Sequence, residues 1–287
     1  MLDIQEHKQT MSNKAQQYDA VIVGLGKTGF SCARYLISKG LNIAITDSRD
    51  NPPCLAEMNK SYPNTPLFLQ GINDVALLAA AQVILSPGVS LSEPAIKQAI
   101  TAGIPVHGDI ELFCREATAP VIAISGSNGK STVTTLVAEI LKNAGRNIAV
   151  GGNLGTPALD LLHEHVDVYV LELSSFQLET TFSLNADASV VLNVSPDHMD
   201  RYSDIAAYAH AKQKIYSGQG LKVVNKDDEL VRQMVTADEQ SIGFSLSEPD
   251  ESDFGLRKLD DELWLCRGEH PIVRATELGI RGEHNIA

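Results

Sequence analysis

Short apolar runs alternate with amphipathic segments from Tyr18 onward, and the amphipathic segments have the spacing of helices. One helix is predicted over 93–102, with Pro94 suitably placed in its first turn. Strands that alternate with helices are typical of a parallel sheet covered by helices on both faces. The apolar runs predict strands at 20–23, 42–46, 66–69, 83–85 and 105–107.

A second series of the same kind begins at Pro120. Its first helix is predicted over 131–144, is ended by Gly145 and carries one apolar face. Residues 255–276 alternate apolar and polar positions around two aspartates, which predicts an antiparallel hairpin appended to the sheet. The apolar helix face consists of Val133, Leu136, Val137, Ile140, Leu141 and Ala144, and further strands are predicted at 121–124, 168–173, 189–193, 222–224 and 241–244.

The two series predict an α/β protein of two domains, which suits a chain of 287 residues and 30.9 kDa. Residues 1–17 are polar and predict a flexible tail. We expect one domain over 18–108 and a second over 109–287, although no proline- or glycine-rich linker marks the boundary near 108–118.

Composition narrows the possible partners. The formal net charge is −13, whereas a protein that binds duplex nucleic acid needs a basic surface, so nucleic acid is not an expected partner. The 4 cysteines are scattered, which argues against a disulfide framework or a zinc module. The opening residues lack the apolar segment of a signal peptide, and the longest apolar stretch, 75–85, is too short to span a bilayer. We therefore expect a cytoplasmic protein that does not contact a membrane.

The sharpest chemical signal is the sequence SGSNGKST at 125–132, which lies between a predicted strand and an amphipathic helix. In such a loop, backbone N–H groups converge on phosphate oxygens. Lys130 would lie against the β- and γ-phosphates, and the Ser131 hydroxyl would ligate magnesium. A strict P-loop has glycine where Ile124 stands, so this is a shortened variant. The alternative is a glycine turn that only caps a helix.

A second glycine motif, Gly24-x-Gly26-x-x-Gly29, follows the first predicted strand, and Asp47 ends the next one. This pattern is typical of a loop that brings a nucleotide diphosphate to a helix N-terminus. The motif alone does not identify the ligand, and a purely structural turn stays open as the alternative. Asp47-Ser48-Arg49 would lie near a ribose or base, although Arg49 is equally an ordinary surface residue.

Polar side chains also follow three other predicted strands, at the strand ends where open α/β sheets bind their ligands. Glu172 is flanked by leucines and needs a partner for its buried charge, for which magnesium is suited beside a P-loop. His198 belongs to a polar run that favours ligand binding or catalysis over a structural role. Asn153 lies in a glycine-rich segment that is either a substrate contact or a plain turn. The three segments are 151–155, 171–177 and 193–200.

Taken together, the motifs GLGKTG, SPGV, GDIELF, SGSNGKST, GGNLG, LELSSFQLE, DHMDRY and GEHN stand in an order that resembles the Mur ligase family, over residues 18–287. The resemblance implies a Rossmann-like first domain that holds the UDP end of a substrate rather than a nicotinamide. Lys27, Thr28, Ser48 and Arg49 would contact the uracil. The UDP-substrate contacts implied in both domains are Gly26, Lys27, Thr28, Ser48, Arg49, Ser86, Gly88, Asn153 and Ser174.

The resemblance also implies a P-loop ATPase-type second domain with two magnesium sites. Ser131 and Glu172 would ligate the first magnesium, and His198 with a carbamylated Lys212 would ligate the second; Lys214 is the less favoured choice for that lysine. Lys130, His198 and Lys212 would be the catalytic residues. The implied ATP contacts are Gly126, Ser127, Asn128, Gly129, Lys130, Ser131, Thr132 and, near the adenine, Asn285.

The implied activity is an ATP-dependent C–N ligation in peptidoglycan precursor synthesis, which adds D-glutamate to UDP-N-acetylmuramoyl-L-alanine through an acyl phosphate. The partners would be these small molecules, and we expect a monomer. Because the family's GEHN motif stands at the end of the sequence, we expect this chain alone to have little ligase activity. Three alternatives remain: a non-catalytic nucleotide-binding fragment, an NAD-dependent oxidoreductase and a folylpolyglutamate synthase.

Overall fold

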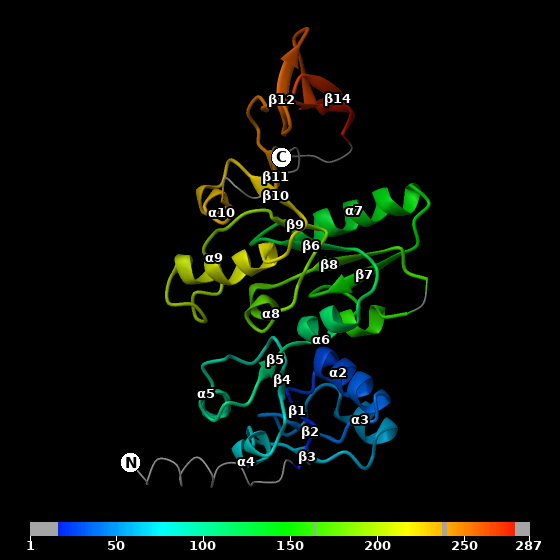
Figure 1. Cartoon of the computed structure of the whole chain (residues 1–287), viewed down its shortest axis with the longest axis vertical. Helices are drawn as coiled ribbons and strands as arrows, with labels where there is room; N and C mark the ends of the chain where they lie inside the picture. Colours follow the sequence, from blue (N-terminus) through cyan, green and yellow to red (C-terminus); the bar gives the residue numbers. More distant parts are fainter. Residues whose placement is uncertain (1–16, 164, 237–239, 279–287) are drawn as a thin grey trace. The chain divides into compact units, whose positions relative to one another are not determined.

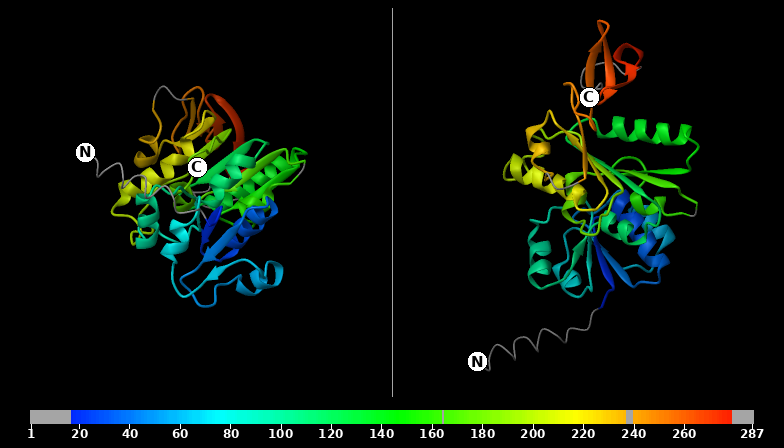
Figure 2. Two further views of the ribbon diagram at one scale, coloured as in Figure 1. Left: turned by 60° about the horizontal axis from the view of Figure 1, so that its bottom comes forward. Right: turned by 45° about the horizontal axis from the view of Figure 1, so that its top comes forward.

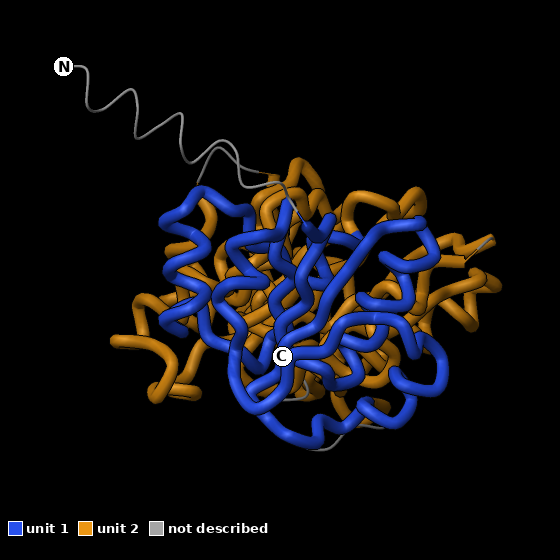
Figure 3. The backbone as a smooth tube through the Cα atoms, turned by 90° about the horizontal axis from the view of Figure 1, so that it is seen from below, with its two compact units in different colours: residues 1–113 blue, residues 114–287 orange. Residues whose placement is uncertain are grey.

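The computed structural model of the chain describes residues 17–163, 165–236 and 240–278. It divides into two compact units, Met1–Phe113 and Cys114–Ala287, which Figure 3 shows in different colours. The expected tail, apart from Gln17, and the predicted adenine contact Asn285 lie outside the described residues. Among the described residues, no helix combines the length and apolar character needed to cross a bilayer.

Unit 1 is a five-stranded parallel sheet in the order β3-β2-β1-β4-β5, drawn in blue to cyan in Figure 1. The central strand is buried at every position because helices cover both faces of the sheet. The strand order reverses between the first and fourth strands, which places a ligand crevice at their carboxyl ends. The strands are β1 (Ala20–Val23), β2 (Ile43–Thr46), β3 (Leu67–Phe68), β4 (Val83–Leu85) and β5 (Val106–His107); the helices are α2 (Lys27–Ser38), α3 (Leu55–Ser61), α4 (Asp74–Leu78), α5 (Pro94–Thr101) and α6 (Asp109–Glu116), which crosses into unit 2.

Unit 2 is a nine-stranded mixed sheet in the order β14-β13-β12-β11-β10-β9-β6-β8-β7. The helices α7 and α8 lie on opposite faces of its parallel part (Figure 1). The parallel strands are β6 (Val121–Ser125), β7 (Ile148–Gly152), β8 (Val168–Glu172), β9 (Ala188–Val191), β10 (Leu221–Asn225) and β11 (Ser241–Phe244). The helices are α7 (Lys130–Asn143), α8 (Ser175–Glu179), α9 (Ile205–Gln213) and α10 (Glu229–Arg232), with the 3-10 turns η1 (Ala158–Leu161), η2 (Lys214–Tyr216) and η3 (Ala275–Glu277).

The predicted hairpin at the carboxyl-terminal end of the sheet is present and has a third strand. The strands β12 (Phe254–Leu259) and β13 (Glu262–Arg267) are antiparallel, and Asp260 and Asp261 form their turn with φ of 48° and 63°. β14 (His270–Arg274) then pairs antiparallel with β13. These strands project from the rest of unit 2 in orange and red in the right-hand view of Figure 2.

The helix α7 differs from the sequence prediction in the face that it buries. Val133, Val137 and Leu141 do pack against the core around Ile124, Val170 and Val190. Leu136 and Ile140, which the apolar pattern placed on the same face, are 43% and 59% exposed. The most buried positions are instead Thr134 and Ala138, whose small side chains let the helix approach the sheet closely.

Candidate functional site

The glycine loop of unit 2 joins the end of β6 to the start of α7. Gly126 has φ of +152° and Gly129 has φ of +79°, values that side chains with a Cβ rarely adopt. At Gly126, a Cβ would also lie 3.1 Å from the Cβ of Leu192. The two glycines therefore let the backbone turn sharply into the helix, in the strand–loop–helix arrangement that the sequence predicted.

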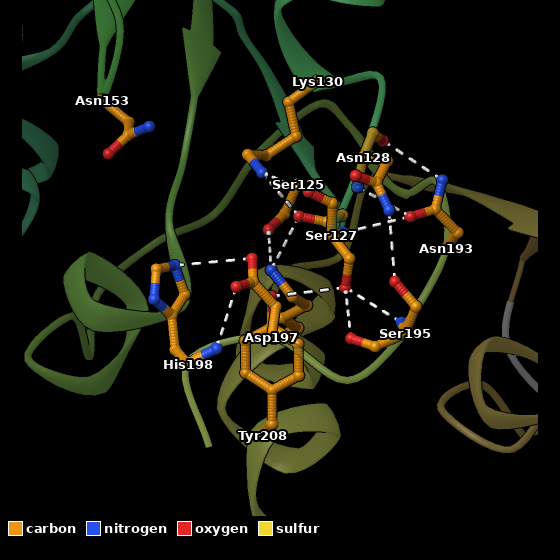
Figure 4. Close-up of polar contacts among 12 residues, drawn as sticks. Ser125, Ser127, Asn128, Lys130, Asn153, Asn193, Ser195, Asp197, His198 and Tyr208 are labelled. Carbon is orange, nitrogen blue, oxygen red and sulfur yellow. Dashed lines mark hydrogen bonds and ion pairs between the residues drawn. The ribbon is translucent and has the colours of Figure 1, made fainter. Parts of the chain in front are cut away.

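The loop places positive groups around its turn. Lys130 Nζ donates to the carbonyl oxygens of Gly126 and Ser127, at 2.9 Å each, so this side chain folds back over the loop (Figure 4). The N-cap residue of α7 is Gly129, which has no side chain to cap the helix. The N–H groups in the first turn of this 14-residue helix can therefore bind an anion.

A buried carboxylate lies beside the helix start. Glu172 ends β8 and is 2% exposed; its Oε2 accepts from Ser131 Oγ, and its Oε1 accepts from Asn153 Nδ2, both at 2.8 Å. The register of the sheet brings these residues together, because Gly152 pairs with Glu172 and Asn153 N–H donates to the Glu172 carbonyl. A carboxylate with a neighbouring hydroxyl is a set of oxygen donors that suits magnesium.

Lys212 approaches the same loop from α9. It is 1% exposed, and its Nζ donates to the Gly126 carbonyl at 2.8 Å and to Ser125 Oγ at 3.4 Å. Its ammonium also lies 4.6 Å from the centre of the Tyr208 ring. Burial and the positive charge of Lys130 lower the pKa of Lys212 to about 7, against the opposing effect of Asp197.

His198 lies on the loop that follows β9, in a left-handed conformation with φ of 53°. Its Nε2 is 3.5 Å from Asp197 Oδ2, and its ring centre is 4.9 Å from that of Phe176. The side chain is 48% exposed. Within the described ranges, no group of three or more His, Cys, Asp or Glu residues could hold a metal. The predicted magnesium sites do not depend on such a group, because their predicted ligands include Ser131 in one site and Lys212 in the other.

The remaining predicted residues of unit 2 lie in the glycine loop, at the start of α7 and at the start of α8. Ser127 and Asn128 form hydrogen bonds with the segment after β9, and Thr132 is exposed in the first turn of α7. Ser174 caps α8: its Oγ accepts from Gln177 N–H at 3.2 Å, and the Gln177 side chain accepts from Ser174 N–H. The structure thus gives Ser174 a helix-capping role, whatever its role toward a substrate.

In unit 1, the predicted residues gather at the carboxyl ends of three neighbouring strands. Gly26 precedes α2, which begins with Lys27 and Thr28. Ser48 and Arg49 follow β2, and Ser86 with Gly88 follow β4. Hydrogen bonds connect these loops, since Ser86 Oγ donates to the Gly24 carbonyl at 3.1 Å and Leu25 N–H donates to Asp47 Oδ2 at 2.7 Å.

Asp47 anchors the first glycine loop. Besides the N–H of Leu25, it accepts from Arg49 Nε at 2.8 Å and from Arg49 Nη2 at 2.7 Å. Burial raises the pKa of Asp47, but the hydrogen bonds from Arg49 and Leu25 outweigh this effect and hold the pKa below its ordinary value of 3.8. Sequence reasoning placed Asp47 near a base or ribose but did not include it among the site residues.

Sequence reasoning also gave no role to three residues that contact the unit 2 site: Asn193, Asp197 and Tyr208. Asn193 and Asp197 belong to the polar run after β9, so their location was available from the sequence. Tyr208 precedes Lys212 by four residues on one helix, a spacing that puts both on the same face.

The strand–loop–helix geometry around Lys130 is that of proteins that bind nucleotide phosphates through a P-loop. Residues 18–108 match the model of the Mur ligase MurD-like N-terminal domain, and residues 124–287 match the model of the Mur ligase middle domain. The chain belongs to the Mur ligase family.

Curated relatives are similar over nearly all of this chain. UDP-N-acetylmuramoylalanine–D-glutamate ligase from Nitrosococcus oceani is 51% identical over 269 residues, which are 93% of this chain and 59% of the relative. The protein of the same name from Pseudomonas aeruginosa is 48% identical over 277 residues, 96% of this chain and 62% of the relative. The chain therefore spans about 60% of the length of these relatives.

Solved structures share the fold at lower sequence identity. UDP-N-acetylmuramate:L-alanyl-gamma-D-glutamyl-meso-diaminopimelate ligase from Neisseria meningitides has a TM-score of 0.61 and 16% identity, over 94% of this chain and 90% of that chain. UDP-N-acetylmuramate-alanine ligase from Thermotoga maritima has a TM-score of 0.53 and 21% identity, over 94% of this chain and 62% of that chain. Both support the α/β architecture predicted from the sequence.

Proposed function

We propose that this chain supplies the UDP-substrate and ATP sites of an ATP-dependent ligase that joins D-glutamate to UDP-N-acetylmuramoyl-L-alanine. About half of the aligned residues are identical in relatives that carry the name of this ligase. The observation that carries the ATP site is the bond between Ser131 and the buried Glu172. It puts a hydroxyl and a carboxylate where a P-loop protein holds magnesium against the nucleotide phosphates.

In the proposed reaction, the terminal carboxylate of UDP-N-acetylmuramoyl-L-alanine attacks the γ-phosphorus of ATP, and ADP leaves. The amine of D-glutamate then attacks the carbonyl carbon of the acyl phosphate, loses a proton and displaces inorganic phosphate as the amide forms. Lys130 and the N–H groups of the first turn of α7 would stabilise the negative charge on the phosphoryl oxygens. The side chain of Lys130 would exchange its loop carbonyl partners for phosphate oxygens.

Bound magnesium would supply positive charge beside those same oxygens. Ser131 and Glu172 suit one ion. The hydrogen bonds that the two carboxylate oxygens of Glu172 accept come from neutral groups, which do not neutralise the negative charge that would bind the ion. We assign a second ion to His198 and Lys212. The Lys212 ammonium would first lose a proton; the neutral amine would then combine with carbon dioxide and release a second proton, so that the cationic side chain becomes an anionic carbamate ligand. Burial and the positive charge of Lys130 lower the pKa of Lys212 to about 7, which favours the neutral amine that reacts with carbon dioxide and supports this assignment.

The UDP end of the substrate would bind in unit 1. The loops after β1, β2 and β4 meet there through bonds of Leu25 to Asp47 and of Ser86 to Gly24. A Cβ on Gly26 would meet no atom within 4 Å, so this position leaves room for a ligand to approach the backbone. Lys27, Thr28 and Arg49 would supply the polar contacts.

The test is a calorimetric titration of the chain with Mg–ATP, with UDP-N-acetylmuramoyl-L-alanine and with NADH. The decisive variant is Lys130→Ala, which removes a charged partner of the phosphates. We expect its affinity for Mg–ATP to fall about tenfold to a hundredfold, while binding of the UDP compound is unchanged. Lys142→Ala is the matched control, because Lys142 is on the same helix, is 68% exposed and pairs with Glu139.

Unchanged Mg–ATP binding by Lys130→Ala would contradict the ATP assignment. Tight NADH binding without binding of the UDP compound would contradict the assignment of unit 1 and would favour an oxidoreductase.

A further inference from the structure

Asn193, two residues after β9, forms hydrogen bonds to the glycine loop of unit 2 through its side-chain amide. Its Oδ1 accepts from Asn128 N–H at 2.8 Å and from Ser127 N–H at 3.2 Å. Its Nδ2 donates to the Asn128 carbonyl at 3.1 Å (Figure 4). The one side chain therefore satisfies both the N–H and the carbonyl of Asn128, which fixes the orientation of that part of the loop.

Further hydrogen bonds join the glycine loop to the segment that contains Asn193 and Ser195. Ser127 N–H also donates to the Asn193 carbonyl at 2.9 Å. Ser127 Oγ accepts from Ser195 N–H at 3.0 Å, and Asn128 Nδ2 donates to Ser195 Oγ at 3.1 Å. The loop and the segment after β9 lie side by side because β6 and β9 are neighbouring parallel strands. Contacts within the chain thus define the conformation of the loop.

The contacts divide the N–H groups of the glycine loop into two sets. Those of Ser127 and Asn128 are taken up by Asn193, whereas the N-cap residue of α7, Gly129, has no side chain that could take up those of the first helical turn. An anion at this loop would therefore meet the N–H groups of the first turn of the helix. An amide suits this task because its oxygen accepts hydrogen bonds without adding a full negative charge beside phosphate.

We infer that Asn193 is a positioning residue: its amide holds the loop so that nucleotide phosphates bind at the first turn of α7. This inference rests on the proposed ATP site and adds a residue that acts through the loop, without a contact to the nucleotide. It distinguishes Asn193 from Lys130, Ser131 and Glu172, which would face the nucleotide or its metal.

The experiment compares Asn193→Ala with Asn225→Ala. Asn225 is a matched control: it is also half-buried and ends the adjacent strand β10, and its Nδ2 donates to the carbonyl of Leu192 at 2.8 Å. For Asn193→Ala, we expect the dissociation constants of Mg–ADP and Mg–ATP to rise about tenfold to a hundredfold, since several loop hydrogen bonds are lost. Asn225→Ala should change them less than about threefold.

Two further readouts separate positioning from general stability. Without added nucleotide, amide exchange at Asn128 should accelerate at least about tenfold in Asn193→Ala and not in Asn225→Ala, whereas Ser127 N–H keeps its bond to the Asn193 carbonyl. Asn193→Asp keeps both acceptor bonds, so it should preserve this protection. Its added charge should nevertheless weaken Mg–ADP binding, and the loss should shrink at high salt.

The outcomes separate the inference from the proposed function. If the wild-type chain binds Mg–ADP and Asn193→Ala binds it equally well, the positioning role is overturned and the ATP site stands. If the wild-type chain binds no nucleotide, the proposed ATP site fails, and the positioning role fails with it. Equal losses in Asn193→Ala and Asn225→Ala would also overturn the inference, because they would reflect damage to the sheet end.

Discussion

The two glycine loops of this chain have the same local plan but different anchors. Each joins a buried parallel strand to a helix, and in each a polar side chain from a neighbouring strand end accepts from loop N–H groups. In unit 1 that residue is Asp47, which accepts from Leu25. In unit 2 it is Asn193, which accepts from Ser127 and Asn128. One anchor is a carboxylate and the other is a neutral amide.

The difference in charge corresponds to a difference in surroundings. Asp47 is paired with Arg49 on the same strand end, so its charge is compensated locally. The unit 2 loop instead has two lysines, Lys130 and Lys212, bonded to its carbonyl oxygens. A loop with cations and a neutral anchor suits the concentrated charge of a triphosphate. A carboxylate anchor suits a site where a base or ribose offers hydrogen-bond donors.

The largest expected effect comes from Gly29→Ala in the unit 1 loop. A Cβ on Gly29 would lie 1.9 Å from the Gly24 carbonyl oxygen, so α2 would have to move away from β1. We expect unit 1 to lose about 3 kcal/mol of stability, as for severe overpacking. Gly26→Ala is the control within the same motif and should change stability by less than about 0.5 kcal/mol, because its Cβ would meet nothing within 4 Å.

Urea unfolding can assign this loss to one unit. The thiol of Cys32, 1% exposed on α2, reports the opening of unit 1, and the fluorescence of Trp264, the chain's only tryptophan, reports unit 2. The midpoint seen by Cys32 should fall in Gly29→Ala, while that seen by Trp264 stays. Equal stability of the two glycine variants would mean that the close approach of helix and strand is not what Gly29 provides.

A second prediction concerns magnesium binding at the carboxylate of unit 2. Glu172→Gln keeps the size of the side chain and removes the charge that would bind magnesium. We expect the affinity for ATP in magnesium to fall about tenfold, equal to about 1.4 kcal/mol. In EDTA the variant should bind ATP as well as the wild-type chain or better, because a carboxylate beside phosphate is then repulsive.

The same titrations on Glu139→Gln provide the control, since Glu139 lies on α7 and is 58% exposed. A loss of equal size with and without magnesium would remove Glu172 from the metal site and leave it a structural partner of Ser131 and Asn153.

The elements and the loop residues could be predicted because their signals are local. An apolar run followed by glycines and a helical pattern can be recognised within a single stretch of sequence. The strand at 241–244, for example, has the predicted bounds. Glu172 could be found in the same way, since a carboxylate flanked by leucines on a strand requires a polar partner.

The contacts that the two anchors make with the loops could not be predicted, because these contacts depend on strand order. Asn193 lies 65 residues from Asn128 and reaches it only because β9 pairs with β6. The exposed Leu136 and Ile140 show the same limit: the spacing predicts an apolar face, but the packing of Thr134 and Ala138 decides which part of it is buried.

Asp47→Asn tests the carboxylate anchor of unit 1. Because the folded pKa of Asp47 lies below 3.8, its ionised form stabilises the fold above that pH, and this stabilisation is lost as the pH falls through the folded pKa. We expect the variant to be less stable by about 1–3 kcal/mol at pH 7, and the difference should shrink as the pH falls below 3.8 and through the folded pKa. Cys32 labelling with a dipyridyl disulfide during urea unfolding provides the measurement. A difference that is constant with pH would show that the charge of Asp47 does not contribute.

Arg49→Lys should have the smallest effect. It tests whether Asp47 stabilises unit 1 through its ion pair with Arg49 or through its bond to the loop. The Arg49 side chain is 51% exposed, although Asp47 is buried, so water screens the pair from one side and lysine keeps the charge. The same unfolding measurement should therefore show a loss below about 1 kcal/mol. Lysine keeps the charge but loses the two-point contact with the carboxylate, whereas the bond from Leu25 N–H to Asp47 remains. A loss as large as that of Asp47→Asn would mean that the ion pair, and not the bond to the loop, is the contribution of Asp47. In that case, the likeness between Asp47 and Asn193 as loop anchors would not hold.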